Sequence, residues 1–391
     1  MFAALRPRRS WINTLVSACI GSLAAATSGL AEEANSLVDR DAVTVSLNDD
    51  LIENDFSQAD YVEDDFIDYA WEDSACDACD ACGDAVAACC CKPWWAHRCG
   101  VFGEFLLLRP GSTDQIFTIE QNSPVAGDFP TGPVGRVNID DSAGYRVGFS
   151  LAASDCTSLL ASYTRVDGST SNTIVAQGGN VLNSQIIHPS TLTTGASSLQ
   201  SSARSSFDFD LIDLGYHHVL RSADCYVVNW LAGFRYGQIN QDLVTQQEVS
   251  TATGLVTNDI DVDFNGFGLS LGIDGERRSQ CTGLMVYGRG LSSFLAGDWK
   301  GSYVQTNQFE GGVVANSYED YRVTPVLELE LGFGWRSRCG RCRASVGYLT
   351  TAWYDAMSTR QYVDAVRATN YVSVDETITF SGLTAALEAN F

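Results

Sequence analysis

Beyond its first 31 residues, the chain lacks any apolar run long enough to form a transmembrane helix. Basic residues are also few: 24 Lys and Arg stand against 48 Asp and Glu, which gives a formal net charge of −24. No basic patch could displace the counterions of a phosphate backbone, so nucleic acid is not an expected partner. Only 3 Met are present, whereas 35 Gly, 15 Tyr and 18 Phe suit a chain rich in β-strands.

The amino-terminus has the pattern of a secretory signal. Three arginines precede a stretch of apolar and small residues that runs to Ala31, and no acidic residue occurs before Glu32. This pattern predicts a signal peptide over residues 1–31, with Gly29-Leu30-Ala31 as the cleavage site. A membrane anchor, or a lipoprotein modified at Cys19, is the alternative. An exported chain without a helical span can still be a membrane protein, because a closed β-barrel pairs its backbone groups between strands.

Residues 32–75 form an acidic segment. They hold 15 Asp or Glu against Arg40 alone, and they lack strong periodicity. This composition predicts a largely disordered tail, located in the periplasm. Aromatic residues within it leave a docking role open.

A cysteine-rich neck follows at residues 76–98. The cysteines in and beside it are Cys76, Cys79, Cys82, Cys89, Cys90, Cys91 and Cys99. An exported protein meets an oxidising compartment, so disulfides are the expected state. The C-x2-C-x2-C spacing leaves a metal site open, but Cys89 to Cys91 depart from the iron–sulfur pattern, and we predict no metal or other cofactor.

Four hairpins share one layout, in which two alternating strands flank a short polar turn that contains cysteine. They span 144–165, 207–236, 264–295 and 324–354. From Tyr145 to Ala153, apolar side chains occupy every second position, and period two predicts a strand with one apolar and one polar face. In the second hairpin the apolar face switches near Ile212-Asp213, and we expect a β-bulge there.

The turns of these hairpins gather the remaining cysteines at one end of the structure. These are Cys156, Cys225, Cys281, Cys339 and Cys342. Together with the neck cysteines they are candidates for disulfides. Bonds from neck to turn, and bonds between chains to a second copy or an envelope partner, are both open.

The last strand, at 379–391, alternates and ends the chain on an aromatic residue. It resembles the closing strand of a bacterial outer-membrane barrel, with its apolar face toward lipid and its polar face toward a lumen. We therefore predict that Leu383, Leu387 and Phe391 form a signal for the barrel-assembly machinery.

Short turns and long polar connections alternate along the chain. The expected long loops are 110–143, 166–206, 241–263, 297–323 and 355–378. This asymmetry is typical of outer-membrane barrels, which have short periplasmic turns and long extracellular loops. An opening strand at 101–108, eight hairpin strands and the closing strand predict an all-β, antiparallel transmembrane barrel over 99–391. The count is ten strands, with twelve as the alternative, and an even count leaves both ends in the periplasm.

The polar faces of the strands carry charged residues that we expect to line the lumen. These are Arg146, Arg235, Glu328, Glu330 and Glu388. We expect Asp259, Asp261 and Asp263, in a predicted loop, to add negative potential at the mouth. A lumen of this charge predicts a weak preference for cations.

Two short motifs suggest chemistry but fit their context poorly. The segment from Gly268 to Gly272 matches a nucleophile elbow, yet it lies in a clean alternating strand with no helix after it. The segment from Asp261 to Gly266 begins like a calcium loop, but Gly272 stands where that loop needs Glu. We predict no catalytic residue and no enzymatic activity.

Three segments carry a family resemblance: 101–110, 207–214 and Gly233-Phe234-Arg235-Tyr236. They resemble the Legionella-type major outer membrane protein family, whose members are pore-forming, cysteine-containing barrels. The resemblance covers about residues 99–391, while the neck is similar to heads on planctomycete surface barrels. It implies a porin that lets small solutes or ions diffuse. The alternative is a structural envelope protein cross-linked through its cysteines, because side chains can fill a barrel of few strands.

Overall fold

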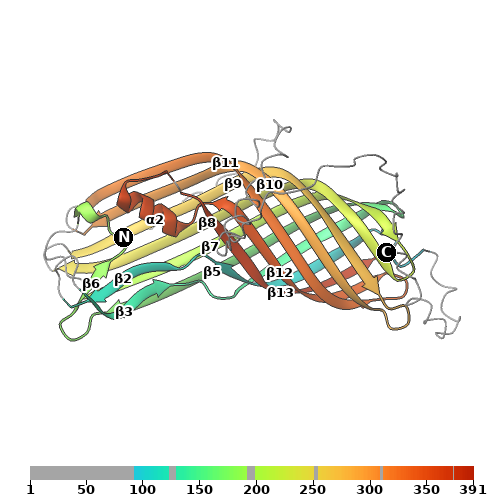
Figure 1. The fold of residues 1–391 in the computed structure, drawn as a ribbon, viewed down its shortest axis with the longest axis horizontal. Coiled ribbons are helices and arrows are strands. Elements are labelled where there is room, and N and C mark those ends of the chain that lie inside the picture. Colours follow the sequence, from blue (N-terminus) through green and yellow to red (C-terminus); the bar gives the residue numbers. More distant parts are fainter. Residues whose placement is uncertain (1–91, 123–128, 192–198, 251–253, 309–310, 373) are drawn as a thin grey trace, which may run out of the picture. The chain divides into compact units, whose positions relative to one another are not determined.

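The computed structural model describes residues 92–122, 129–191, 199–250, 254–308, 311–372 and 374–391 (Figure 1). The predicted signal peptide, the acidic tail and the cysteines at 76–91 lie outside these residues. The elements are β1 (Gly100–Gly111), β2 (Gln115–Gln121), β3 (Pro130–Val137), β4 (Ser142–Ser154), β5 (Thr157–Val175), β6 (Val181–Ser184), η4 (Pro189–Thr191), β7 (Gln200–Ser222), β8 (Tyr226–Ser250), β9 (Gly254–Arg278), β10 (Leu284–Asn307), β11 (Gly311–Arg336), β12 (Cys342–Ala356), α2 (Thr359–Ala368) and β13 (Glu376–Asn390).

Ten strands close into an antiparallel barrel in the order β1-β13-β12-β11-β10-β9-β8-β7-β5-β4 (Figure 1). The opening strand β1 closes the barrel, since it pairs with the final strand β13 on one side and with β4 on the other. The predicted fold class is thereby confirmed. Three further strands do lie in the connections, but β2, β3 and β6 form a sheet of their own outside the ten.

The two ends of the barrel differ in their connections. Short turns join β4 to β5, β7 to β8, β9 to β10 and β11 to β12 at one end, which we call the turn end. The sheet of β2, β3 and β6 and the helix α2 lie toward the other end, which we call the loop end (Figure 1).

Several strands are about twice as long as a membrane crossing requires. A transmembrane β-strand needs about 9–11 residues, whereas β8, β9, β10 and β11 have 25, 25, 24 and 26. The prediction of long loops at 241–263 and 297–323 is therefore wrong, because most of these residues continue the strands. The outer faces of these strand extensions are polar, and a sequence rich in polar residues predicts a loop.

The inner face of the barrel is apolar in the loop half and polar in the turn half, and the outer face has the opposite arrangement. On β7, Phe207, Phe209 and Leu211 are buried in the interior, while Asp208 and Asp210 lie on the outer face. From Ile212 onward the pattern is the reverse: Asp213 is buried inside, while Ile212 and Leu214 are exposed on the outer face. The side-chain parity does not change, and the irregularity in the pairing of β7 with β8 lies between Val219 and Arg221. The predicted bulge at Ile212-Asp213 is therefore wrong, because the polarity of the two faces changes there while the strand pairing stays regular.

The turn half of the barrel carries the apolar outer face. Its exposed side chains include Phe105, Val147, Phe149, Leu214, Phe234, Leu269, Leu271, Leu329, Leu331, Leu383 and Leu387. An apolar band of this kind suits contact with lipid. No helix in the described part of the chain is long and apolar enough to cross a membrane.

The helix α2 lies within the predicted loop 355–378 and packs on the inner faces of β8, β9 and β10. Ser358 caps its start by accepting a hydrogen bond from the Gln361 N–H, and Thr369 ends it in the left-handed conformation. Tyr362 is fully buried and covers Gly301 of β10, where a Cβ atom would lie 2.7 Å from the tyrosine ring. The helix thus fills the lumen at the loop end.

Candidate functional site in the barrel lumen

The central lumen holds an ion triad built from three strands. Arg235 of β8 is 1% exposed, and its Nε lies 2.6 Å from Asp213 Oδ1 of β7. Its Nη2 lies 2.8 Å from Glu328 Oε2 of β11, and β11 is three places from β8 in the barrel order. A buried cation requires close partners, because removing it from water costs several kcal/mol. The triad therefore ties opposite parts of the wall together.

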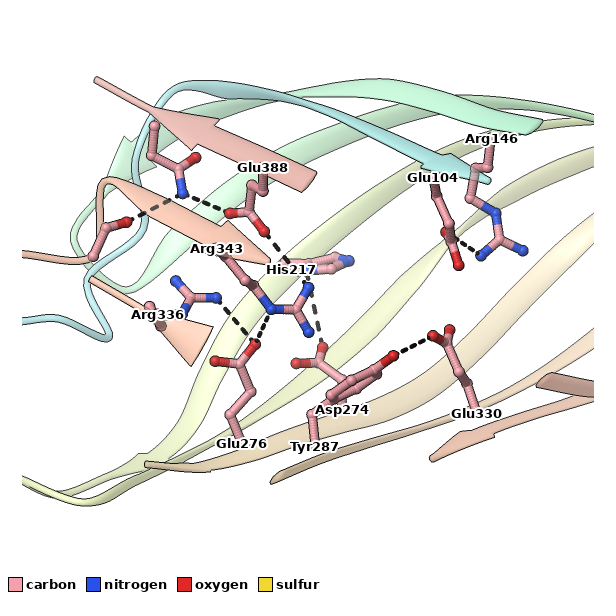
Figure 2. A network of polar contacts seen from close by, with 12 residues as sticks. Glu104, Arg146, His217, Asp274, Glu276, Tyr287, Glu330, Arg336, Arg343 and Glu388 are labelled. Carbon is pink, nitrogen blue, oxygen red and sulfur yellow. Dashed lines mark hydrogen bonds and ion pairs between the residues drawn. The ribbon is translucent and has the colours of Figure 1, made fainter. Parts of the chain in front are cut away.

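A second buried pair lies on the other side of the lumen, between β1 and β4 (Figure 2). Arg146 Nη1 donates to Glu104 Oε2 at 3.0 Å, and Arg146 Nε donates to Thr164 Oγ1 at 3.0 Å. The two charged residues are directly opposite in the strand register. Sequence analysis did not predict Glu104 as a lining residue, although its place between Gly103 and Phe105 in an alternating strand marks it as inward-facing.

Glu330 of β11 has neutral partners. Its Oε1 accepts from the hydroxyl of Tyr287 at 2.7 Å (Figure 2). The same oxygen accepts from the hydroxyl of Thr384 at 3.1 Å. Sequence analysis did not predict Tyr287 as a lining residue either, because alternation is poor in the second strand of the third hairpin.

Nearer the turn end, arginines and acids form a network (Figure 2). Glu276 Oε1 lies 3.0 Å from Arg336 Nη2 and 3.1 Å from Arg343 Nε. Arg343 Nη1 lies 3.6 Å from Glu388 Oε2 and stacks over the ring of Tyr287. Shared ion pairs of this kind link β9, β11, β12 and β13 at the turn end.

A cavity of about 220 Å³ lies among these groups at the turn end, and we call it the vestibule. Its lining includes His97, His217, Asn229, Asp274 and Arg289. Asp274 Oδ2 accepts from the Asn229 amide at 2.9 Å, while His217 Nδ1 is 4.0 Å from Asp274 Oδ1 (Figure 2). Among the described residues, no group of three or more His, Cys, Asp or Glu could hold a metal ion.

Residues 92–98 lie across the turn end, and we call them the turn-end cap. Trp94 is buried, donates from Nε1 to the carbonyl of Asp224 at 2.7 Å and packs under the guanidinium of Arg278. The His97 N–H donates to the Asp155 carbonyl, and its ring lies 2.6 Å from the Ser158 hydroxyl. Gly340 has φ +71°, and a Cβ there would lie 2.6 Å from the Trp94 carbonyl, so the cap requires glycine at that turn.

Above the charged groups, aromatic side chains from opposite walls meet in the lumen. We call this cluster the aromatic plug; it comprises Phe207, Phe209, Phe264, Trp299, Trp353 and Phe380, all at most 2% exposed. Phe209 of β7 stacks on Phe380 of β13 at 5.4 Å between centroids, and Phe264 of β9 meets Trp353 of β12 edge to face at 6.1 Å. Neither pair comes from neighbouring strands. The plug therefore fills the lumen between vestibule and loop end.

The structure brings together the residues predicted to line a pore. Arg146, Arg235, Glu328 and Glu330 are buried inside the barrel, and Glu388 lies at the vestibule. Arg146, Arg235, Glu328 and Glu388 are engaged in ion pairs and Glu330 in hydrogen bonds, so their part in conduction stays a prediction. Alternation alone predicted their inward face, but it could not show the plug above them.

The predicted acidic mouth is wrong. Asp259, Asp261 and Asp263 alternate with the buried Ile260, Val262 and Phe264 in the first half of β9, so they face outward along the barrel wall. The extended backbone also rules out the calcium-loop conformation for 261–266. Ser270 of the elbow motif lies in the same strand with its side chain buried toward the lumen.

The turn cysteines lie at the turn end, as their spacing predicted. Cys99, Cys156 and Cys342 carry free thiols, whereas Cys225, Cys281 and Cys339 are disulfide-bonded. Bonds between chains through the free thiols stay a prediction. Leu383, Leu387 and Phe391 are 55%, 70% and 77% exposed on the outer side of the closing strand, and their recognition during assembly also stays a prediction.

The fold and the family agree. The family model of the Legionella pneumophila major outer membrane protein precursor matches residues 90–390. The chain belongs to this family of outer-membrane β-barrels. The family is therefore the one that the motifs in β1, β7 and β8 had suggested, and the matched region begins just before the turn-end cap.

The chain is also similar to two solved structures. The outer membrane protease OmpT from Escherichia coli is 12% identical, with a TM-score of 0.41 over 76% of this chain and 97% of that one. A Pseudomonas aeruginosa FadL homologue is 9% identical, with a TM-score of 0.21 over 76% of this chain and 90% of that one. No curated protein sequence matches the chain.

Proposed function

We propose that this family member is a structural outer-membrane barrel whose lumen is closed in its resting state. The observation that supports this most is the aromatic plug, in which Phe209 and Phe380 meet across the lumen. Ions cannot pass a dry, close-packed aromatic layer, because nothing there replaces their hydration.

The closure has two further layers. The buried face of α2, including Tyr362, Val363 and Val366, joins the same apolar cluster on the loop side. The turn-end cap covers the vestibule from the other side. A solute would therefore have to displace at least two packed layers.

In this proposal the turn end faces the periplasm. The chain enters the barrel there, and the exposed thiols of Cys156 and Cys342 are available for bonds to a neighbouring copy or an envelope partner. The apolar outer face of the turn half rests in lipid.

Planar-bilayer conductance of the refolded mature chain tests the closed lumen. Wild type is expected to be silent with and without reductant, and the double substitution Phe209→Ala/Phe380→Ala to conduct. Leu214→Ala, on the outer face of the same strand, is the matched control and should stay silent. Steady conductance by wild type would refute the proposal.

A gated, porin-like channel is the second candidate, and the charges of the lumen favour it. Replacing a buried ion pair by apolar residues is often neutral or stabilising, so a purely structural core has little need of Arg235, Asp213 and Glu328. A channel would need them as its lining once α2 and the plug move aside.

The discriminating experiment tethers the helix. A disulfide between Gly301→Cys and Tyr362→Cys would hold α2 on β10. If the barrel is a gated channel, openings under high voltage should occur in the reduced protein and vanish on oxidation. No openings in either state would leave only the structural role.

A further inference from the structure

The vestibule contains an arginine whose charge acts on Asp274 and Glu328 but that forms no ion pair with a described residue. Arg289 of β10 lies in the register directly opposite Asp274 of β9 and Glu330 of β11. No hydrogen bond or ion pair joins its guanidinium to any residue in the described ranges, because those two acids are turned to other donors. Asp274 is held by Asn229, and Glu330 by Tyr287 and Thr384.

The same cavity contains carboxylate oxygens without a hydrogen bond. Asp274 Oδ1 is buried and accepts none from the described residues, since His217 Nδ1 stands 4.0 Å away. Glu276 Oε2 and Glu104 Oε1 are likewise buried and accept no hydrogen bond from the described residues. A buried charged oxygen left unpaired costs free energy. Within the described ranges, the vestibule therefore offers one cation without an ion pair and several anionic oxygens without a hydrogen bond, on adjoining strands.

We propose that the vestibule binds a small zwitterionic solute of the α-amino acid class. Its carboxylate would pair with Arg289 and its ammonium group with Asp274 Oδ1. The strand register holds these two side chains side by side, as a ligand with two opposite charges on groups bonded to one carbon requires. This binding goes beyond the structural role, since a barrel closed by its plug can still bind a solute that passes the turn-end cap.

The balance of charge in the lining selects against simple ions. Four arginines and five acids line the cavity. A lone anion would face the acids, while a lone cation would leave Arg289 unpaired. A zwitterion adds no net charge and satisfies both groups.

Size restricts the ligand as well. At about 220 Å³, the cavity is smaller than the roughly 300–1,000 Å³ of drug-sized ligand sites. It suits a side chain as small as that of alanine or serine.

Calorimetric titration of the refolded full chain in detergent tests the inference. L-Alanine is the probe, N-acetylalanine lacks the ammonium group, and alaninol lacks the carboxylate. We expect alanine to bind and each analogue to bind roughly tenfold or more weakly, as the loss of a charge-assisted hydrogen bond predicts. Equal binding of N-acetylalanine would indicate a plain anion site and overturn the proposal, as would no binding of alanine.

Variants locate the site independently. Arg289→Gln and Asp274→Asn should each weaken alanine binding by a similar factor, whereas Arg338→Gln, an exposed arginine in a turn, should not. Heat-modifiable migration on gels confirms that each variant is folded. Unchanged binding by folded Arg289→Gln would refute the assignment, whatever the outcome of the conductance experiment on the closed lumen.

Discussion

Phe209 of β7 and Phe380 of β13 stack face to face across the lumen, with ring centroids 5.4 Å apart and planes inclined by 13°. Four steps along the barrel order separate their strands. The contact is therefore not a local strand pair but a tie between opposite walls, and it divides the polar vestibule from the apolar loop end.

Truncation of this tie should destabilise the barrel. Phe209→Ala is expected to cost about 3–5 kcal/mol, because it leaves a cavity in a packed core. Leu214→Ala on the lipid side of β7 should cost clearly less. Urea unfolding in lipid vesicles, followed by tryptophan fluorescence, measures both, and equal losses would contradict the packed plug.

Breaking the ion triad should be as severe. Arg235→Met leaves Asp213 and Glu328 buried without their cation, and the expected loss is about 3–5 kcal/mol. The triple substitution with Asp213→Asn and Glu328→Gln should recover much of it. Arg165→Met removes an exposed cation near Asp208 and Asp210 and should cost at most about 1 kcal/mol. If Arg235→Met unfolds at the wild-type midpoint, the triad is not structural.

Acid should loosen the turn-end cap. Burial lowers the pKa of His97 below its usual value of about 6.5, and the positive charge of His218 and Arg336 acts in the same direction, against the side-chain interaction with Asn229, which raises it. The folded cap thus holds neutral His97, so its stability is present above about pH 6.5 and is lost as pH falls below that value.

Alkylation of Cys99, two residues after His97, reports this opening. The ratio of its rate in wild type to that in His97→Gln should rise between pH 7 and pH 5, and the ratio cancels the intrinsic pH dependence of the thiol. A flat ratio would show that His97 does not control the cap.

The cysteines should react in two classes. Alkylation before reduction is expected to label Cys99, Cys156 and Cys342, and alkylation after reduction to label Cys225, Cys281 and Cys339 as well. Alternate turns lie about 10 Å apart, twice the strand spacing, whereas a disulfide requires Cα atoms within about 7 Å. We therefore predict bonds to the cysteines of 76–91, and peptide mapping that finds Cys225 bonded to Cys281 would contradict this.

Removal of the terminal aromatic residue should affect insertion rather than export. Deleting Phe391 is expected to reduce the amount of heat-modifiable protein in the outer membrane and to leave the periplasmic amount intact. Leu220→Ala, another exposed apolar residue, serves as the control. Equal insertion of both variants would remove Phe391 from the assembly signal.

The sequence alone determined the strands of the membrane half. Period-two alternation from Tyr145 to Ala153 and the turns around Cys156 and Cys225 are local features, and local pattern predicts them well. The count of ten, the closing strand and the inward face of Arg235 followed directly from that alternation.

Tertiary structure decided the rest. Asp208 and Asp210 face outward and Phe207 and Phe209 inward because the apolar outer face of β7 ends at Ile212. A strand pattern does not reveal which solvent surrounds each face. Likewise, the meeting of Phe209 with Phe380, or of Arg235 with Glu328, depends on closure of the barrel. Residues far apart in sequence come together only when ten strands share one axis, so the closed lumen could not be read from the chain.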